Sequence, residues 1–179
     1  MAWTREPLEE HELDQLISAA SERDLKHEFT VRILAYTGLR ADELAHMTED
    51  WVDWQNEQIR VPPSQDDWSP KTDHAARTIP VREPATVRVL REFFKRRDSV
   101  DVTRKAIYER VVRVADDTDL RKKVTPHALR HTYGTLIAAN GASAQYIRQT
   151  MGHADLSSAN DYIKFSGKQL ADEADDVWT

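Results

Sequence analysis

The stretch that decides the fold reads Thr125-Pro126-His127-Ala128-Leu129-Arg130-His131-Thr132-Tyr133-Gly134. Pro126 suits the first turn of a helix, so we expect a helix over residues 126–139. At about 100° per residue, one face of this helix carries the side chains expected in the core, which are Leu129, Tyr133, Leu136 and Ile137. The opposite face, which we expect to lie outside the core, carries His127, Arg130, His131 and Gly134. It presents a fixed positive charge and two imidazoles beside a glycine, where another group can approach the backbone closely.

Two other interpretations of this helix remain open. One is a solvated basic face that binds nothing. The other is a zinc site of a metal-dependent hydrolase, because His127 and His131 are four residues apart, as in a zinc-binding helix. Against zinc, Arg130 would lie between the two ligands, and the glutamate of the H-E-x-x-H pattern is missing. We therefore predict that the protein binds no metal.

The composition narrows the class of protein. The chain has 179 residues, which suits one domain, and it contains no cysteine, which excludes a disulfide scaffold, a thiol nucleophile and Cys-ligated zinc. No apolar run approaches the roughly 20 residues that span a bilayer, and the first residues lack the layout of a signal peptide. We therefore expect a cytoplasmic protein that makes no membrane contact.

The charges are distributed unevenly along the chain. The net charge is −6, yet residues 121–153 hold five Lys or Arg, three His and no acidic residue. Residues 88–113 are also basic, with nine Lys or Arg against four acids. An acidic protein with such a stretch is expected to direct it at an anionic partner, although a basic surface without a partner is the alternative.

Hydrophobic periodicity predicts a mainly α fold with a small three-stranded antiparallel sheet. Leu8, Leu13, Leu16 and Ile17 form the apolar stripe of a first helix. Gly38 ends a second helix, and a short third helix follows. The expected strands are Trp51–Trp54, Gln58–Val61 and Arg77–Val81. From Pro84 the chain is helical again, over about 84–97, 103–116, 126–139, 143–151, 156–164 and 167–176.

Several polar residues stand at positions that favour chemistry. Arg40 follows the helix-ending Gly38 and precedes a helix, where a cation is electrostatically unfavourable, and Glu43 can brace its guanidinium. Gly152 ends another predicted helix and presents His153 beyond it. Taken singly, each has an ordinary structural interpretation: a surface ion pair or a capping histidine. The same holds for Lys71, in the long connection after the second strand, and for Tyr162, which suits a packing tyrosine.

In combination these residues resemble the catalytic set of the tyrosine recombinases, the phage-type integrases. The set is Arg40, Lys71, His127-x-x-Arg130, Gly152-His153 and Tyr162. The surrounding sequence is similar too: Thr37-Gly38-Leu39-Arg40 with Glu43-Leu44, Lys71 before Arg77-Thr78-Ile79-Pro80, His127-Ala128-Leu129-Arg130-His131-Thr132, and Met151-Gly152-His153 with Tyr162 nine residues later. The resemblance covers about residues 5–165 and implies the catalytic-domain fold of that family.

The resemblance also implies a reaction that exchanges phosphodiesters without a metal or other cofactor. Arg40 and Arg130 would clamp the phosphate, and Tyr162 would attack it to form a covalent phosphotyrosine. His127 would act as base and then as acid, Lys71 would protonate the departing 5′-oxygen, and His153 would bind the phosphate. Glu43 and His131 would support these groups.

The implied partner is double-stranded DNA, bound by a homo-tetramer that is monomeric when free. We expect residues 1–179 to form one catalytic domain, without the N-terminal helical domain that family members usually carry. Residues 167–179 would form a tail helix that docks on a neighbouring protomer. The alternative is an integrase-like regulator, or a defective remnant, that binds DNA without recombining it.

Overall fold

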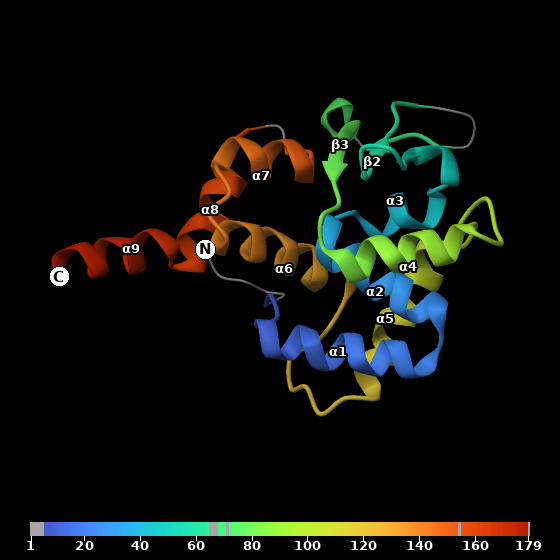
Figure 1. Cartoon of the computed structure of the whole chain (residues 1–179), viewed down its shortest axis with the longest axis horizontal. Helices are drawn as coiled ribbons and strands as arrows, with labels where there is room; N and C mark the ends of the chain where they lie inside the picture. The colour runs from blue at the N-terminus through green and yellow to red at the C-terminus, as the bar shows by residue number, and fades with distance from the viewer. Residues whose placement is uncertain (1–5, 65–67, 71, 154, 179) are drawn as a thin grey trace.

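The computed structural model describes residues 6–64, 68–70, 72–153 and 155–178 (Figure 1). The helices and strands, in chain order, are α1 (Glu10–Arg23), α2 (Leu25–Thr37), α3 (Ala41–His46), β1 (Val52–Asp53), β2 (Gln58–Val61), β3 (Arg77–Pro80), α4 (Pro84–Phe94), α5 (Arg104–Asp116), α6 (Pro126–Ala139), α7 (Ala144–Met151), α8 (Ser157–Ser166) and α9 (Lys168–Val177). Short 3-10 turns lie at Glu49–Trp51 and Asp73–Ala75. The predicted class, mainly α with a three-stranded sheet, is confirmed.

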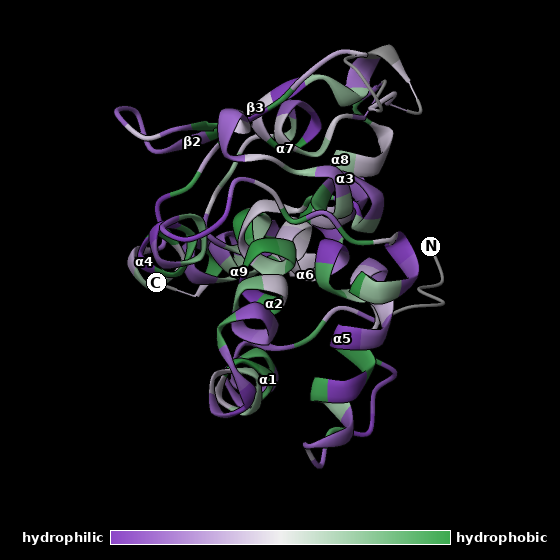
Figure 2. Ribbon diagram, turned by 90° about the vertical axis from the view of Figure 1, so that its right-hand side faces the viewer, coloured by the Kyte–Doolittle hydropathy of each residue, from purple (hydrophilic) through white to green (hydrophobic). Residues whose placement is uncertain are grey.

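Helix α2 is the centre of the larger core and packs against α1, α4, α5 and α6 (Figure 1). Phe29 of α2 is fully buried and stacks on Phe93 of α4, with ring centroids 3.7 Å apart. The predicted stripe of α1 is buried as expected, since Leu13 and Leu16 lie in this core. Figure 2 shows hydrophobic and hydrophilic residues alternating around α1 and α5, as expected for helices with one buried face.

The sheet is antiparallel in the order β1-β2-β3, with Val52 opposite Ile59 and Ile59 opposite Ile79. These apolar side chains face the larger core, where Ile59 and Ile79 are fully buried. The sheet therefore covers one side of the helical body, and the start of β3 lies beside α7. Figure 1 shows β3 and α7 side by side.

A second, smaller core joins α6, α7 and α8. Its buried members are Tyr133, Ala138, Ile147, Met151, Ala159 and Tyr162. The core position predicted for Tyr133 is therefore confirmed. Because α6 packs against α2 on one side and against α8 on the other, it lies between two cores.

This placement overturns the prediction that α6 has one core face and one outer face. Arg130 and Gly134 are buried, although the periodicity placed them outside the core. Leu136, predicted in the core, is only half-buried. The physical reason is that α8 covers this face at Gly134, where the Tyr162 ring lies, and the C-terminal ends of α2 and α7 enclose Arg130. His127, at the start of the same face, stays exposed.

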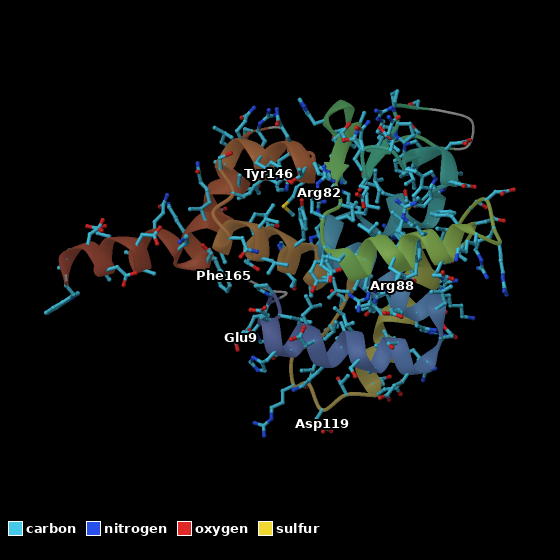
Figure 3. The ribbon with its side chains drawn as sticks, viewed as in Figure 1. Glu9, Arg82, Arg88, Asp119, Tyr146 and Phe165 are labelled. Carbon is cyan, nitrogen blue, oxygen red and sulfur yellow. The ribbon has the colours of Figure 1, made fainter. Side chains whose placement is uncertain are left out.

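The last helix, α9, projects from the body and has no buried residue (Figure 1). Its apolar side chains are largely in water: Leu170 is 73% exposed and Trp178, just beyond it, is 87% exposed. Phe165, near the end of α8, is also exposed and is labelled in Figure 3. No helix in the described part of the chain has the length and apolar character needed to cross a membrane.

Candidate active site

Arg130 lies where the C-terminal ends of two helices meet. Its Nη1 donates to the carbonyl of Gly38, just after α2, and its Nη2 donates to the carbonyl of Met151, at the end of α7, at 2.6 Å. Helix C-termini carry partial negative charge, so they favour a guanidinium there. Burial, together with the charges of Arg40 and Arg77, lowers the pKa of Arg130 to about 9, and the side chain therefore keeps its charge at neutral pH.

The turns that create this arrangement are set by two glycines. Gly38 and Gly152 have φ of 70° and 74°, the left-handed conformation that ends α2 and α7. An added Cβ would also lie 2.4 Å from the Tyr133 ring at Gly38 and 2.9 Å from the His74 carbonyl oxygen at Gly152. Both positions therefore require glycine for conformation and for space.

Arg40 is the N-cap residue of α3, immediately before Ala41. Its backbone N–H donates to Glu43 Oε1 at 2.8 Å, and its Nη1 lies 3.5 Å from Glu43 Oε2. The bracing predicted for Glu43 is thus present. The Arg40 guanidinium remains partly open to solvent, and burial lowers its pKa from the ordinary value.

Sequence reasoning missed Arg77 as a site residue. Its guanidinium donates to both Glu43 carboxylate oxygens, at 2.6 and 2.9 Å, and to the carbonyls of Thr150 and Ala75, each at 2.7 Å. Burial raises the pKa of Glu43, but the hydrogen bonds and charge of Arg77 outweigh it and hold that pKa below its usual value. The available signal was the stretch Arg77-Thr78-Ile79-Pro80, which the resemblance included without a role for Arg77. The need of Glu43 for a second cation is visible only in the structure, where Glu43 is buried.

Tyr162 of α8 is 4% exposed and lies flat against α6. An added Cβ at Gly134 would come within 2.6 Å of its ring, so the missing side chain makes room for the tyrosine. The Tyr162 hydroxyl is 2.8 Å from Nδ1 of His131. Burial raises the pKa of Tyr162 to about 12, against the opposing effect of Arg130 and Arg40. A tyrosine in this state needs a base before it can act as a nucleophile.

The other two histidines lie around the same point. His127 is exposed, and its ring centroid is 5.0 Å from that of His131. His153 lies nearly parallel to the Tyr162 ring, at a centroid distance of 6.2 Å. Burial and the charges of Arg130 and Arg40 lower the pKa of His153 to about 4, so it is neutral at pH 7. Its buried Nδ1 has no hydrogen-bond partner within the described residues.

A cavity of about 660 Å³ opens beside these groups. Arg40, His127 and Arg130 line one part of it, and the α5 side and the loop before α6 supply Arg104, Lys105, Tyr108 and Lys123. Apart from Glu43, the acid that contributes to the lining is Asp42. The cavity therefore suits a polyanion larger than one phosphate group.

The structure brings most of the predicted set together. Arg40 with Glu43, Arg130, His131 with Tyr162, and His153 with Tyr162 form one cluster, with His127 beside it. Lys71 lies outside the described residues. The described part of the chain contains no group of three or more His, Cys, Asp or Glu residues that could hold a metal ion, so His127 and His131 have no third ligand there.

Comparisons of the sequence and the fold with known proteins agree with one another. The sequence model of the phage integrase family matches residues 6–168. The chain is 27% identical over 166 residues to the tyrosine recombinase XerD of Listeria innocua, covering 83% of this chain and 53% of that protein. It therefore spans about half the length of the curated relatives it matches.

Two solved structures are similar in fold. The crystal structure of XerA recombinase has a TM-score of 0.75 and 28% identity, covering 91% of this chain and 60% of that one. The catalytic domain of bacteriophage HP1 integrase has a TM-score of 0.67 and covers 96% of this chain and 94% of that one. At 20% identity, this second likeness shows the fold alone.

Proposed function

The chain belongs to the phage integrase family, and on that premise we propose that it is the catalytic part of a site-specific recombinase. It breaks and rejoins double-stranded DNA through a 3′-phosphotyrosine formed at Tyr162. The observation that carries this proposal is the cluster of Arg40 and Arg130 beside a buried tyrosine whose hydroxyl is hydrogen-bonded to a histidine.

The charge of the cluster supports phosphate binding. Within the described residues, Glu43 is the acid that pairs with both Arg40 and Arg77, and Arg77 already holds it with two hydrogen bonds. The remaining positive charge belongs to Arg40 and Arg130. Guanidiniums can donate two parallel hydrogen bonds to phosphate oxygens, and they stabilise the extra negative charge of a pentavalent transition state.

The reaction follows from these groups. Tyr162 Oη forms a bond to the phosphorus while the bond from phosphorus to the 5′-oxygen breaks. The family resemblance assigns the tyrosine proton to His127, and assigns Lys71 as the donor that protonates the leaving 5′-oxygen. His153, neutral at pH 7, can hydrogen-bond a non-bridging oxygen. The reverse sequence reseals the strand, and the covalent link conserves the bond energy, so no ATP is consumed.

The cavity supports a duplex as substrate. Beyond the two arginines, Arg104, Lys105 and Lys123 continue the positive lining, and none of the three is paired closer than 3.9 Å with an acid within the described residues. Such cations contact phosphates along the backbone and position the strand without reading its sequence. The exposed apolar side chains of α9, which include Leu170 and Val177, fit a contact with a second protomer in a tetramer on DNA.

The test uses a pool of nicked duplexes randomised around the cleavage position. Cleavage next to the nick releases a short fragment, so the reverse reaction is lost and the protein stays attached. We expect a denaturant-resistant adduct that forms in the presence of EDTA and is absent for Tyr162→Phe, which should bind DNA as the unchanged chain does. Binding without any adduct would instead favour a regulator that keeps the fold.

A further inference from the structure

Two residues of α6, three positions apart, fix the position of Tyr162, which packs against α6 from α8. Gly134 leaves the space in which the tyrosine ring lies, and His131 binds the hydroxyl at 2.8 Å through Nδ1. The imidazole contacts the very oxygen that the proposed reaction activates. His127, which lies one helical turn before His131, instead lines the cavity with Arg40 and Arg130.

The direction of this hydrogen bond depends on where the protons are. A neutral imidazole has one donor nitrogen and one acceptor nitrogen. Burial raises the pKa of Tyr162 to about 12, so the phenol holds its proton at neutral pH and can donate it. If Nδ1 of His131 accepts that bond, the imidazole proton is on Nε2, and the bond already follows the path of proton transfer.

We propose that His131, rather than His127, is the catalytic residue that takes the proton of Tyr162. The inference rests on the proposed function. As the Tyr162 oxygen bonds to phosphorus, its proton moves to Nδ1 of His131 and the imidazole becomes positively charged. The bond from phosphorus to the 5′-oxygen breaks, and that oxygen takes a proton from the leaving-group acid assigned to Lys71. On resealing, the 5′-hydroxyl gives its proton back to that acid and bonds to phosphorus, the bond from phosphorus to the tyrosine oxygen breaks, and His131 returns its proton to that oxygen. His127 is left to contact the phosphate.

The surrounding charges connect this step to DNA binding. The groups near the pair are His127 on α6, His153 after α7, the guanidiniums of Arg130 and Arg40, and the carboxylate of Asp161, which precedes Tyr162 in the chain. A positive imidazole is unfavourable beside the two guanidiniums, whose charge Asp161 offsets only in part, until a further anion arrives. A bound phosphate supplies negative charge at that place. The proton transfer is thus favoured when DNA is bound, and the tyrosine stays protonated when it is not.

The first test does not depend on activity. Nitrogen-15 NMR of the histidine-labelled full chain reports which ring nitrogen of His131 carries the proton. We expect the Nε2–H form with Nδ1 as acceptor, and a change in the Nδ1 signal in Tyr162→Phe. His127→Asn, the matched control, should leave the His131 signal in place. A proton on Nδ1 would mean that His131 donates to the tyrosine, which would overturn the proposal.

The second test distinguishes a residue that takes the proton of the nucleophile from one that protonates the leaving group. A duplex with sulfur in place of the bridging 5′-oxygen has a leaving thiol with a pKa near 8.5, which needs no acid. His131→Asn should form adduct about 10²- to 10⁴-fold more slowly on both duplexes, the usual contribution of a general base. Lys71→Ala should form adduct slowly on the ordinary duplex, and the duplex with the bridging sulfur should restore its rate. Thermal melting of each variant shows that the fold is kept.

The outcomes are distinguishable. This inference alone is overturned if His131→Asn forms adduct at the unchanged rate. It is also overturned if the duplex with the bridging sulfur restores the rate of His131→Asn. If His127→Asn loses more of its rate of adduct formation than His131→Asn does on the sulfur duplex, His127 is the residue that takes the tyrosine proton. That result overturns the inference as well. A wild-type chain that forms no adduct on either duplex overturns the proposed function, and this step with it.

Discussion

The Glu43 carboxylate and the Arg77 guanidinium form a buried pair, joined by hydrogen bonds of 2.6 and 2.9 Å, with their side chains 2% and 4% exposed. The pair connects α3 to β3, and the bond from Arg77 to the Thr150 carbonyl extends the connection to α7. Arg40 immediately precedes α3 and His153 follows α7, so the pair sets the relative positions of two candidate phosphate ligands. Arg77 is therefore a positioning residue.

Arg77→Met should destabilise the fold strongly. It leaves the Glu43 charge buried with a much weaker partner, a change that costs about 3–5 kcal/mol of unfolding free energy. Combining it with Glu43→Gln should recover part of that loss. Arg60→Met is the control, because Arg60 pairs with Asp53 from an exposed position. Its loss should change the free energy of unfolding only slightly. Equal urea-unfolding curves for Arg77→Met and Arg60→Met would refute the contribution of the buried pair to stability.

Arg130→Ala should cost stability as well as cleavage. The periodicity of α6 suggested that this change would leave the fold intact, but Arg130 is buried and donates to two main-chain carbonyls. Each carbonyl left without a donor costs about 1–3 kcal/mol. Leu136→Ala, at a half-buried position, should cost less than the about 2–5 kcal/mol of a fully buried leucine. A larger melting loss for Leu136→Ala than for Arg130→Ala would contradict this account of α6.

The low pKa of His153 predicts a pH dependence of stability. Its pKa is about 4 in the folded chain and about 6.5 when unfolded, so between these values the unfolded chain binds more protons. His153 should therefore contribute a loss of stability as pH falls from about 6.5 towards 4. Urea unfolding at several pH values should show a shallower decline for His153→Asn. Parallel curves would mean that His153 titrates normally in the folded chain.

The tail helix should weaken DNA binding by the free chain. Residues 168–179 carry a net charge of −3, in a chain whose total is −6. We expect micromolar or weaker affinity at physiological salt, falling steeply as salt rises, and tighter binding after deletion beyond Gly167. Changing the four acids of α9 to amides should reproduce this gain while keeping its apolar residues. Titrations of a labelled duplex that show no gain for either variant would refute the electrostatic effect of α9.

Local signals in the sequence were sufficient for most element boundaries. Thr125 and Pro126 provide the cap and the first turn of α6, which runs over the predicted residues 126–139. Gly38 and Gly152 end their helices in the left-handed conformation, as expected. Each of these signals lies within a few residues of the feature it determines, so a single sequence can reveal it.

The burial of Arg130, which was predicted wrongly, and the contacts that were not predicted depend on tertiary packing. Helical periodicity assigns one face to one core, but α6 lies between two cores, so the burial of Arg130 could not be read from its own helix. The pairing of Glu43 with Arg77 spans 34 residues and depends on how the sheet meets α3 and α7. The hydrogen bond between His131 and Tyr162 likewise needs α8 to fold over Gly134. Such contacts follow from tertiary packing, which local patterns do not contain.

The most direct test of the central claim is to locate the covalent bond. The adduct formed with the nicked duplex pool is digested with protease and nuclease, and the nucleotide-bearing peptide is sequenced by mass spectrometry. The account predicts a nucleotide joined through its 3′-phosphate to Tyr162, with a free 5′-hydroxyl on the released fragment. A nucleotide on another residue, or one joined through a 5′-phosphate, would contradict it.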